Sequence, residues 1–97
     1  MQSKSQPTEA RTAATVEAAL RALLAEVLGL PSKRVAGFTD ETLLFGALPE
    51  LDSLAVANFL TAFEERFAVL IEDSDVEAED FDSFGRLLAF TKRMTLA

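Results

Sequence analysis

Five apolar residues in the middle of the chain recur at the spacing of an α-helix, and this pattern constrains the fold more than any other feature. They lie at i, i+3, i+4, i+7 and i+11, which is one face of a helix with 3.6 residues per turn. The residues on this face are Val56, Phe59, Leu60, Phe63 and Phe67. The sequence therefore predicts an amphipathic helix that begins at Asp52 or Ser53, ends near Phe67, and buries its phenylalanines.

The same periodicity appears near both ends of the chain. It predicts a first helix from about Thr12 to Leu28, which Gly29 and Pro31 end. It also predicts a last helix from Ser83 to about Met94, whose basic C-terminal residues suit the helix dipole. The inward-facing residues of the last helix are Phe84, Leu87, Leu88 and Phe90.

Two connections separate these helices. The first, residues 30–52, contains glycines and prolines that interrupt helices, but apolar residues recur through it. We expect a structured loop, held by these apolar anchors, with a short helical turn after Thr39 or Asp40. The second connection contains Ser74-Asp75-Val76-Glu77, which has the spacing of a capping box and predicts one short helix.

Length and composition indicate a single all-α domain. The chain has 97 residues, so we expect a flexible tail over residues 1–11 and one helical domain over residues 12–97. No apolar run approaches the roughly 20 residues of a membrane span, and the N-terminal stretch has no apolar signal-peptide centre. The absence of cysteine suits a reducing compartment. We therefore expect a cytoplasmic monomer.

The net charge of -7 is concentrated in one part of the chain. Residues 40–82 contain thirteen acidic residues and one basic residue. This distribution disfavours a nucleic-acid partner and favours partner proteins with basic docking patches. A calcium loop counted from Asp73 would place Ala78 where glycine is needed and Phe84 where a bidentate glutamate is needed. No metal site is expected.

The only stretch that suggests chemistry is Leu51-Asp52-Ser53-Leu54, at the start of the central helix. The chain has no His, Cys, Trp or Tyr, so the usual nucleophile–base pairs are missing and no enzyme activity is expected. A serine in this setting is a better site for another enzyme to modify than a nucleophile of its own. Two other Asp-Ser pairs, Asp73-Ser74 and Asp82-Ser83, are interpreted as plain helix caps.

The order of these elements and four short motifs resemble the acyl carrier protein family over about Val16 to Met94. The matching residues are Leu51-Asp52-Ser53-Leu54, Glu64-Glu65-Arg66-Phe67, Ile71 and Phe81-Asp82-Ser83-Phe84. The resemblance implies a four-helix bundle of acyl-carrier type, with three main helices, one short third helix and a long loop between the first and second. It also implies a covalent 4′-phosphopantetheine arm on Ser53, with Asp52 and Leu54 as its recognition context.

Such an arm would end in a thiol that carries acyl groups as thioesters, and it would place a phosphodiester at a helix N-terminus, which favours an anion. Before loading, the Ser53 hydroxyl could cap the same helix. The implied partners are a phosphopantetheinyl transferase and acyl-loading and acyl-transferring enzymes. We expect them to contact the outward face of the central helix, formed by Leu54, Ala57, Asn58, Thr61, Glu64 and Glu65.

Two departures from the fatty-acid carrier pattern favour a specialised lipid or secondary-metabolite pathway. The lead-in at residues 46–51 is unusual, and Ala55 and Asn58 occupy positions where fatty-acid carriers often place acids. Two alternatives stay open, an aminoacyl carrier of peptidyl or D-alanyl type and an unmodified acidic interaction module. The stripe of Phe59, Phe63 and Phe67 is interpreted as core, with a sleeve for a bound acyl chain as a second possibility.

Overall fold

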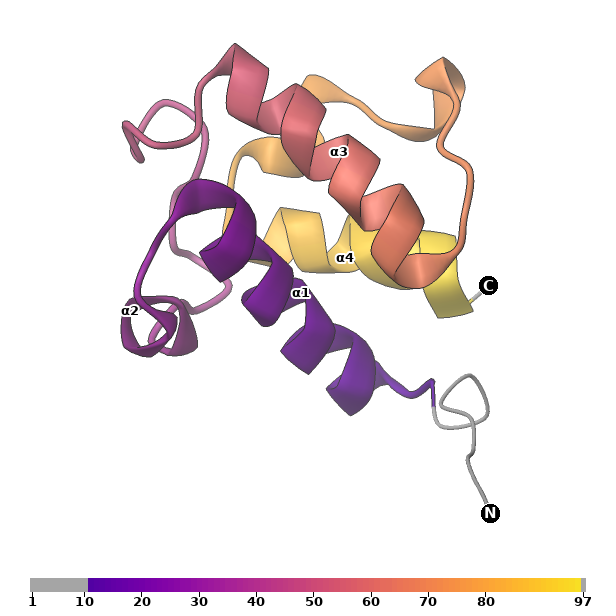
Figure 1. Cartoon of the computed structure of the whole chain (residues 1–97), viewed down its shortest axis with the longest axis horizontal. Helices are drawn as coiled ribbons and strands as arrows, with labels where there is room; N and C mark the ends of the chain where they lie inside the picture. The colour runs from indigo at the N-terminus through magenta and orange to yellow at the C-terminus, as the bar shows by residue number, and fades with distance from the viewer. Residues whose placement is uncertain (1–10, 97) are drawn as a thin grey trace.

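The computed structural model describes residues 11–96 and places them in four α-helices and two short 3-10 turns (Figure 1). The elements in chain order are α1 (Ala13–Leu28), α2 (Ser32–Ala36), α3 (Ser53–Phe67), η2 (Asp73–Asp75), η3 (Ala78–Phe81) and α4 (Phe84–Leu96). These residues contain no β-strand and only one isolated antiparallel bridge, between Leu43 and Ser83. The prediction of an all-α fold is confirmed.

The first helix begins and ends where the sequence predicts. The Thr12 side chain accepts a hydrogen bond from the Thr15 amide at 3.2 Å and caps the N-terminus of α1. Gly29 ends the helix in the left-handed conformation, with φ of 67°, and donates its N–H to the Ala25 carbonyl. The side chains that α1 buries are Val16, Leu20, Leu23, Leu24 and Leu28.

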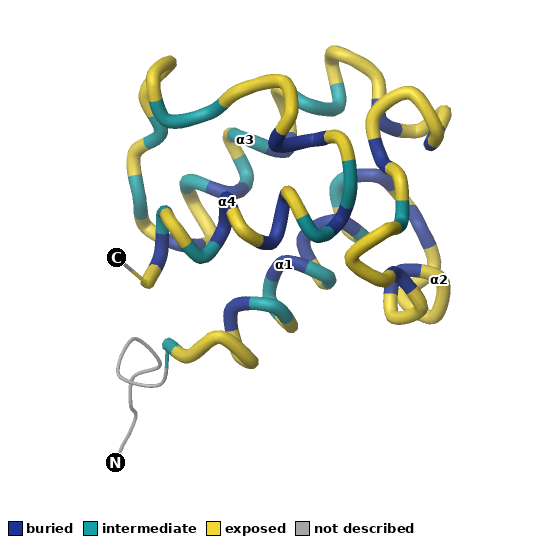
Figure 2. The backbone as a smooth tube through the Cα atoms, turned by 180° about the vertical axis from the view of Figure 1, so that it is seen from behind, coloured by how far each residue is buried: buried dark blue, intermediate teal, exposed yellow. Residues whose placement is uncertain are grey.

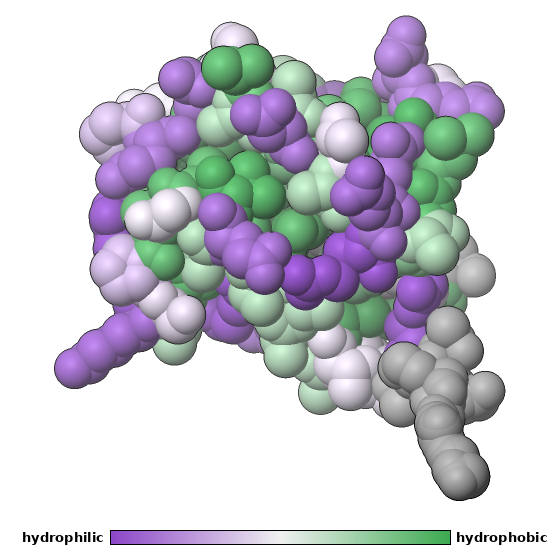
Figure 3. Space-filling view, viewed as in Figure 1, coloured by the Kyte–Doolittle hydropathy of each residue, from purple (hydrophilic) through white to green (hydrophobic). Residues whose placement is uncertain are grey.

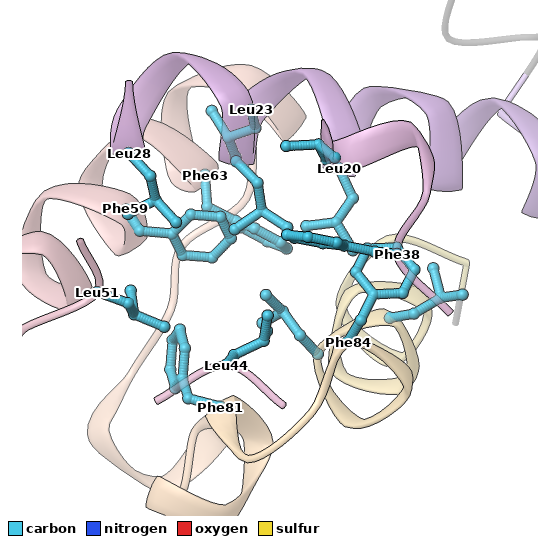
Figure 4. Packing of buried hydrophobic residues seen from close by; sticks show 14 of the residues in the cluster. Leu20, Leu23, Leu28, Phe38, Leu44, Leu51, Phe59, Phe63, Phe81 and Phe84 are labelled. Atoms are coloured by element: carbon cyan, nitrogen blue, oxygen red, sulfur yellow. The ribbon is translucent and has the colours of Figure 1, made fainter. Parts of the chain in front are cut away.

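The core lies between three long helices. In Figure 1, α1 and α3 run side by side in opposite directions, and α4 lies behind them, nearest the viewer in Figure 2. Phe59 and Phe63 of α3 are fully buried, with ring centroids 5.9 Å apart, and Phe63 also lies 5.4 Å from the Phe90 ring of α4. Figure 4 shows leucines of α1 covering these rings from one side. The predicted inward face of the central helix is therefore the centre of the core.

The first connection differs from the prediction because it begins with a helix. Residues 32–36 form α2, whereas the sequence predicts that they belong to the loop. The Pro31 carbonyl accepts hydrogen bonds from the amides of Arg34 and Val35, and the buried Val35 side chain holds the turn against the core. The sequence contained a signal for this helix, because Pro31 precedes it and Gly37 follows it, and these residue types are typical of helix ends. The predicted turn after Thr39 is present, closed by the Thr42 amide on the Thr39 carbonyl.

The second connection also differs, because the predicted single helix is replaced by two 3-10 turns. Ser74 and Glu77 do not form a capping box. Instead, the Glu72 amide donates to Asp75 and the Glu77 amide donates to Asp80, both at 2.9 Å. In each turn an aspartate side chain three residues after the donating amide thus closes a tight turn, where a continuous helix was expected. The interpretation of Asp73-Ser74 as a cap is wrong for the same reason, since Glu72 precedes the turn.

The predicted tail, residues 1–11, lies outside the described residues except for Arg11. The Arg11 guanidinium donates a hydrogen bond to the Phe67 carbonyl at 2.9 Å and lies 5.9 Å from the Phe67 ring centroid. This contact joins the segment before α1 to the C-terminal end of α3.

Candidate functional site

The start of α3 presents Ser53 without using its hydroxyl. Asp52, not Ser53, caps the helix, and its Oδ1 accepts a hydrogen bond from the Ala55 amide at 2.8 Å. The expectation that the Ser53 hydroxyl could cap the helix is therefore corrected. Ser53 is the first residue of α3, it is exposed, and its hydroxyl makes no hydrogen bond with any residue in the described range 11–96. The hydroxyl is thus available to another molecule.

Buried leucines fix the position of Ser53 from the loop side. Leu44, Leu48 and Leu51 are at most 8% exposed and point from the loop into the core. The Leu51 amide also donates to the Leu48 carbonyl at 3.0 Å, so the last turn before α3 is closed. Figure 4 shows Leu44 and Leu51 directed toward the phenylalanine rings. These three predicted anchors place the start of α3 at a defined point of the bundle, whereas Leu43 and Phe45 of the same loop stay exposed.

The two long connections meet at this end of the molecule. The Leu44 amide donates to the Asp82 carbonyl at 3.0 Å, and the Phe45 amide donates to the Phe81 carbonyl at 2.9 Å. At Gly85 a β-carbon would lie only 2.9 Å from the Asp40 carbonyl oxygen, so the close approach of the two segments requires glycine there. The loop before Ser53 is therefore joined to η3 and to the start of α4.

An apolar pocket of about 210 Å³ lies beside Ser53, where these segments meet. The residues that line it are Phe45, Ser53, Val56, Ala78 and Phe81. Sequence reasoning missed Phe45 and Ala78, because each comes from a different connection and only the backbone pairing of the two connections brings them together. The Phe45 side chain stays 50% exposed in the structure, and no local sequence pattern pairs it with Ala78.

The predicted outward face of α3 exists as a stripe of exposed residues. Leu54 is 70% exposed, and Ala57, Asn58, Thr61 and Glu65 are exposed with it. Figure 3 shows that the surface over α3 mixes hydrophobic and hydrophilic residues, so it is not uniformly charged. This exposed stripe is therefore largely neutral, with the Glu65 carboxylate toward the C-terminal end of the helix.

Glu64 does not share the setting of Glu65. Its side chain is half-buried, and its carboxylate accepts a hydrogen bond from the Ile71 amide at 2.7 Å. This contact holds the chain where it leaves α3, so Glu64 has a structural role that the sequence did not indicate. Ala68, which ends α3, adopts the left-handed conformation with φ of 54°, and this turns the chain toward Ile71.

The phenylalanine stripe is core and does not line the pocket beside Ser53. Phe59 and Phe63 are fully buried, and Phe67 is 4% exposed with its ring centroid 4.7 Å from that of Phe63. These rings fill the space that a sleeve along the stripe would need. A bound acyl chain would have to enter instead through the pocket between Val56, Phe45 and Phe81.

Two findings bear on other kinds of site. Among residues 11–96 there is no group of His, Cys, Asp or Glu side chains arranged to hold a metal ion. Within the same range, none of the helices has the length and apolar character needed to cross a membrane.

Comparisons with known proteins agree with this arrangement. The family model described as a phosphopantetheine attachment site matches residues 18–90, most of the chain. The solution NMR structure of a holo acyl carrier protein from Nitrosomonas europaea is 38% identical, with a TM-score of 0.70. The match covers 80% of this chain and 92% of that chain. No curated protein matches the chain.

The chain therefore belongs to the family of phosphopantetheine-binding carrier proteins and has the acyl carrier fold. It is a carrier rather than an enzyme, and its cofactor is covalently attached phosphopantetheine. Carriers of this kind interact with a phosphopantetheinyl transferase and with the enzymes that load and unload the arm. The resemblance stated from the sequence, including its fold, is confirmed.

Proposed function

We propose that Ser53 carries the phosphopantetheine arm and that the protein delivers acyl thioesters to the enzymes of a specialised lipid or secondary-metabolite pathway. The observation that supports this most is the setting of Ser53. It is the first residue of α3, its hydroxyl is exposed, and Asp52 already satisfies the helix end. Modification of Ser53 therefore breaks no hydrogen bond among residues 11–96.

The residues around Ser53 suit the group it would hold. A phosphodiester on Ser53 would lie at the N-terminus of a 15-residue helix, where the dipole favours an anion. Asp52 and Leu54 flank the hydroxyl, and Leu54 is exposed enough for a modifying enzyme to contact. When attached, the arm supplies the thiol that this cysteine-free chain lacks.

Attachment is a phosphoryl transfer in which this chain provides only the acceptor. The Ser53 Oγ forms a bond to the phosphorus that bears the pantetheine of coenzyme A. The diphosphate P–O bond breaks, and adenosine 3′,5′-bisphosphate leaves. The hydroxyl proton passes to a base on the transferase, because none of the residues 11–96 of the carrier hydrogen-bonds to the Ser53 hydroxyl. The fixed start of α3 contributes orientation.

The outward face of α3 is the surface proposed to contact these enzymes. Leu54, Ala57, Asn58 and Thr61 extend from Ser53 along one side of the helix, and Glu65 ends the stripe. A partner with an apolar patch near the arm and a basic residue about three helical turns away would match this surface. The neutral stripe from Leu54 to Thr61 supports a partner set that differs from enzymes docking on a strongly acidic helix.

The test is whether modification is confined to one serine. The protein should be incubated with coenzyme A, Mg²⁺ and a broad-specificity phosphopantetheinyl transferase, digested, and mapped by tandem mass spectrometry. Ser74 and Ser83 are internal controls, because each also follows an aspartate near the start of a helical turn. Modification of Ser53 alone supports the proposal, and modification of Ser74 or Ser83 with Ser53 untouched contradicts it.

A further inference from the structure

An apolar groove with arginines in its lining lies at the end of the bundle opposite Ser53. We propose that this groove binds a small carboxylate that bears an aliphatic chain, and that Arg11 holds the carboxylate. In Figure 1 the start of α1 and the ends of α3 and α4 lie together, on the side of the molecule away from the start of α3. The site is therefore separate from the proposed function, because it uses neither Ser53 nor the arm.

Two adjoining pockets form this groove, called the Arg11 groove below. The inner pocket, of about 270 Å³, lies between α1 and the end of α3, and the outer pocket, of about 460 Å³, reaches the end of α4. Arg11, Phe67 and Ala68 line both pockets, so the two are continuous. The other apolar residues of the lining are Val16, Ala19 and Leu96. A hydrocarbon group in the groove would therefore leave water and contact mainly carbon atoms.

The lining of the Arg11 groove is cationic, although the chain has a net charge of -7. Its charged side chains are those of Arg11 and Arg66, and no Asp or Glu among residues 11–96 lines either pocket. The polar pocket beside Arg93 differs, because carboxylates line it together with the arginine. The Arg11 groove thus combines an apolar surface with positive charge, which suits a ligand that has both a hydrocarbon part and a negative charge.

Arg11 has N–H donors left for such a ligand. Its Nη2 donates to the Phe67 carbonyl at 2.9 Å, and its guanidinium lies 5.9 Å from the centroid of the Phe67 ring, so its position is fixed beside the groove. Within residues 11–96, Arg11 forms no ion pair. A guanidinium carries five N–H groups in a planar fork that matches both oxygens of a carboxylate. The remaining donors can bind a carboxylate while the contact with Phe67 is kept.

Arg66 supplies a second positive charge that can be redirected at low cost. Its Nη2 lies 3.2 Å from Oε1 of Glu26, whose side chain is 68% exposed. An exposed ion pair of this kind contributes little to stability. Arg66 can therefore turn from Glu26 toward a carboxylate that enters the groove, without weakening the fold.

The volume of the inner pocket suits a ligand of moderate size. A buried apolar cavity of about 150 Å³ is large enough for benzene, which has six carbons. In proportion, about 270 Å³ has space for about eleven non-hydrogen atoms, which is about the size of octanoate. The 15-residue helix α3 places this groove about 21 Å from Ser53, so a ligand there leaves the serine accessible.

The experiment titrates the full ¹⁵N-labelled chain with sodium octanoate and follows the backbone amides by NMR. The amides of Ala19 and Ala68 should shift and saturate, with a dissociation constant of about 1 mM or below. At these amides, acetate, which lacks the chain, and octyltrimethylammonium, which has the opposite charge, should each bind at least about tenfold more weakly. Shifts confined to Val56 and Ala78, beside Ser53, would overturn the inference. Equally tight binding of octyltrimethylammonium at Ala19 and Ala68 would also overturn it.

Two variants of α1 test whether the ligand lies in the groove. Ala19→Glu places a carboxylate in the lining and should weaken octanoate binding by about tenfold or more, because like charges repel. Ala18→Glu makes the same change at an exposed neighbour outside the lining and should alter binding by less than about twofold. Far-UV circular dichroism checks that both variants are folded. Equal weakening in the two variants would show that only net charge matters and would contradict the site.

A second pair of variants tests Arg11 itself. Arg11→Met keeps a long side chain but removes the guanidinium, so it should weaken octanoate binding by about tenfold or more. Arg86→Met removes an exposed arginine of α4 that does not line the groove and should leave binding within about twofold of the wild type. Wild-type affinity in Arg11→Met would show that this residue does not hold the carboxylate.

Failure of this inference is distinguishable from failure of the proposed function. Ser53→Ala removes the proposed attachment site and should bind octanoate as tightly as the wild type, because the Arg11 groove lies at the other end of α3. Loss of octanoate binding in Ser53→Ala would place the ligand beside Ser53 and overturn the inference.

Discussion

The guanidinium of Arg21 lies over the ring of Phe84, 4.4 Å from its centroid, and joins three parts of the fold that are distant in sequence. Its Nη1 donates to the carbonyls of Val35 at 2.8 Å and Phe38 at 3.1 Å, where the chain leaves α2. The Nε and Nη2 of the same guanidinium donate hydrogen bonds to the Glu17 carboxylate. One side chain of α1 thus fixes the beginning of the loop that leads to Ser53 against the start of α4.

Arg21→Lys should destabilise the fold by about 1.5–3 kcal/mol. An ammonium group cannot replace the several N–H donors of the planar guanidinium or its contact with the Phe84 ring. Chemical denaturation followed by circular dichroism measures the change. Arg66→Lys is the matched control, because within residues 11–96 Arg66 forms an ion pair only with the exposed Glu26. It should change stability by less than about 1 kcal/mol. Equal effects in the two variants would show that Arg21 does not have this role.

Asp52 should contribute to stability through its cap rather than through its charge. Asp52→Ala should lower the free energy of unfolding by about 1 kcal/mol, whereas Asp52→Asn, which can still accept from the Ala55 amide, should change it by only a few tenths. Denaturant titration of the Asp52→Ala and Asp52→Asn variants, each without the arm, measures the difference in stability between them. A loss in the asparagine variant as large as that in the alanine variant would indicate that the carboxylate charge matters instead.

Replacement of Ala68 by glycine should stabilise the fold, because α3 ends there in a left-handed conformation that disfavours a β-carbon. With φ of 54° and ψ of 46°, we expect Ala68→Gly to raise stability by about 1 kcal/mol. Gly29→Ala, at φ of 67° after α1, is the reciprocal control and should lower stability by a similar amount. If Ala68→Gly is destabilising, the terminal geometry of α3 differs from that described.

Glu64 and Glu65 should respond differently to substitution although they are neighbours. Glu64→Lys removes the acceptor of the Ile71 amide and should lower stability by about 1–2 kcal/mol. Glu65→Lys should leave stability within about 0.5 kcal/mol of the wild type and should slow modification or loading at low salt. Rates across a salt series, with melting curves of both variants, are the measurement. Loading of Glu65→Lys at the wild-type rate at low salt would remove this residue from the proposed interface.

Local patterns in the sequence were sufficient to predict the three long helices. The period of Phe59, Phe63 and Phe67 predicts which face of α3 is buried, and Gly29 predicts the end of α1, because each depends on residues within a few turns. The predicted cap at Ser83 is also present, since its Oγ accepts from the Arg86 amide at 3.2 Å. The motif around Ser53 was recognised because it lies at the start of such a helix.

Features that depend on contacts between distant segments were missed or misplaced. The pocket beside Ser53 needs Phe45 from one connection and Ala78 from the other, and no local pattern pairs them. Glu64 resembles Glu65 in sequence, but only the path of the chain to Ile71 gives it a partner. In the second connection, Glu72 and Glu77 precede the turns in place of Ser74, because aspartates suited to tight turns lie three residues after each of them.

The central claim is that Ser53 is the attachment point of the arm, and intact-mass spectrometry tests it most directly. Wild type and Ser53→Ala should each be incubated with coenzyme A, Mg²⁺ and several broad-specificity transferases. The account predicts the addition of one phosphopantetheine to the wild type and none to Ser53→Ala. The circular dichroism spectrum of this variant should match the wild type, because the Ser53 hydroxyl makes no hydrogen bond with residues 11–96. A wild type that stays unmodified with every transferase, or a Ser53→Ala variant that gains the arm, would contradict it.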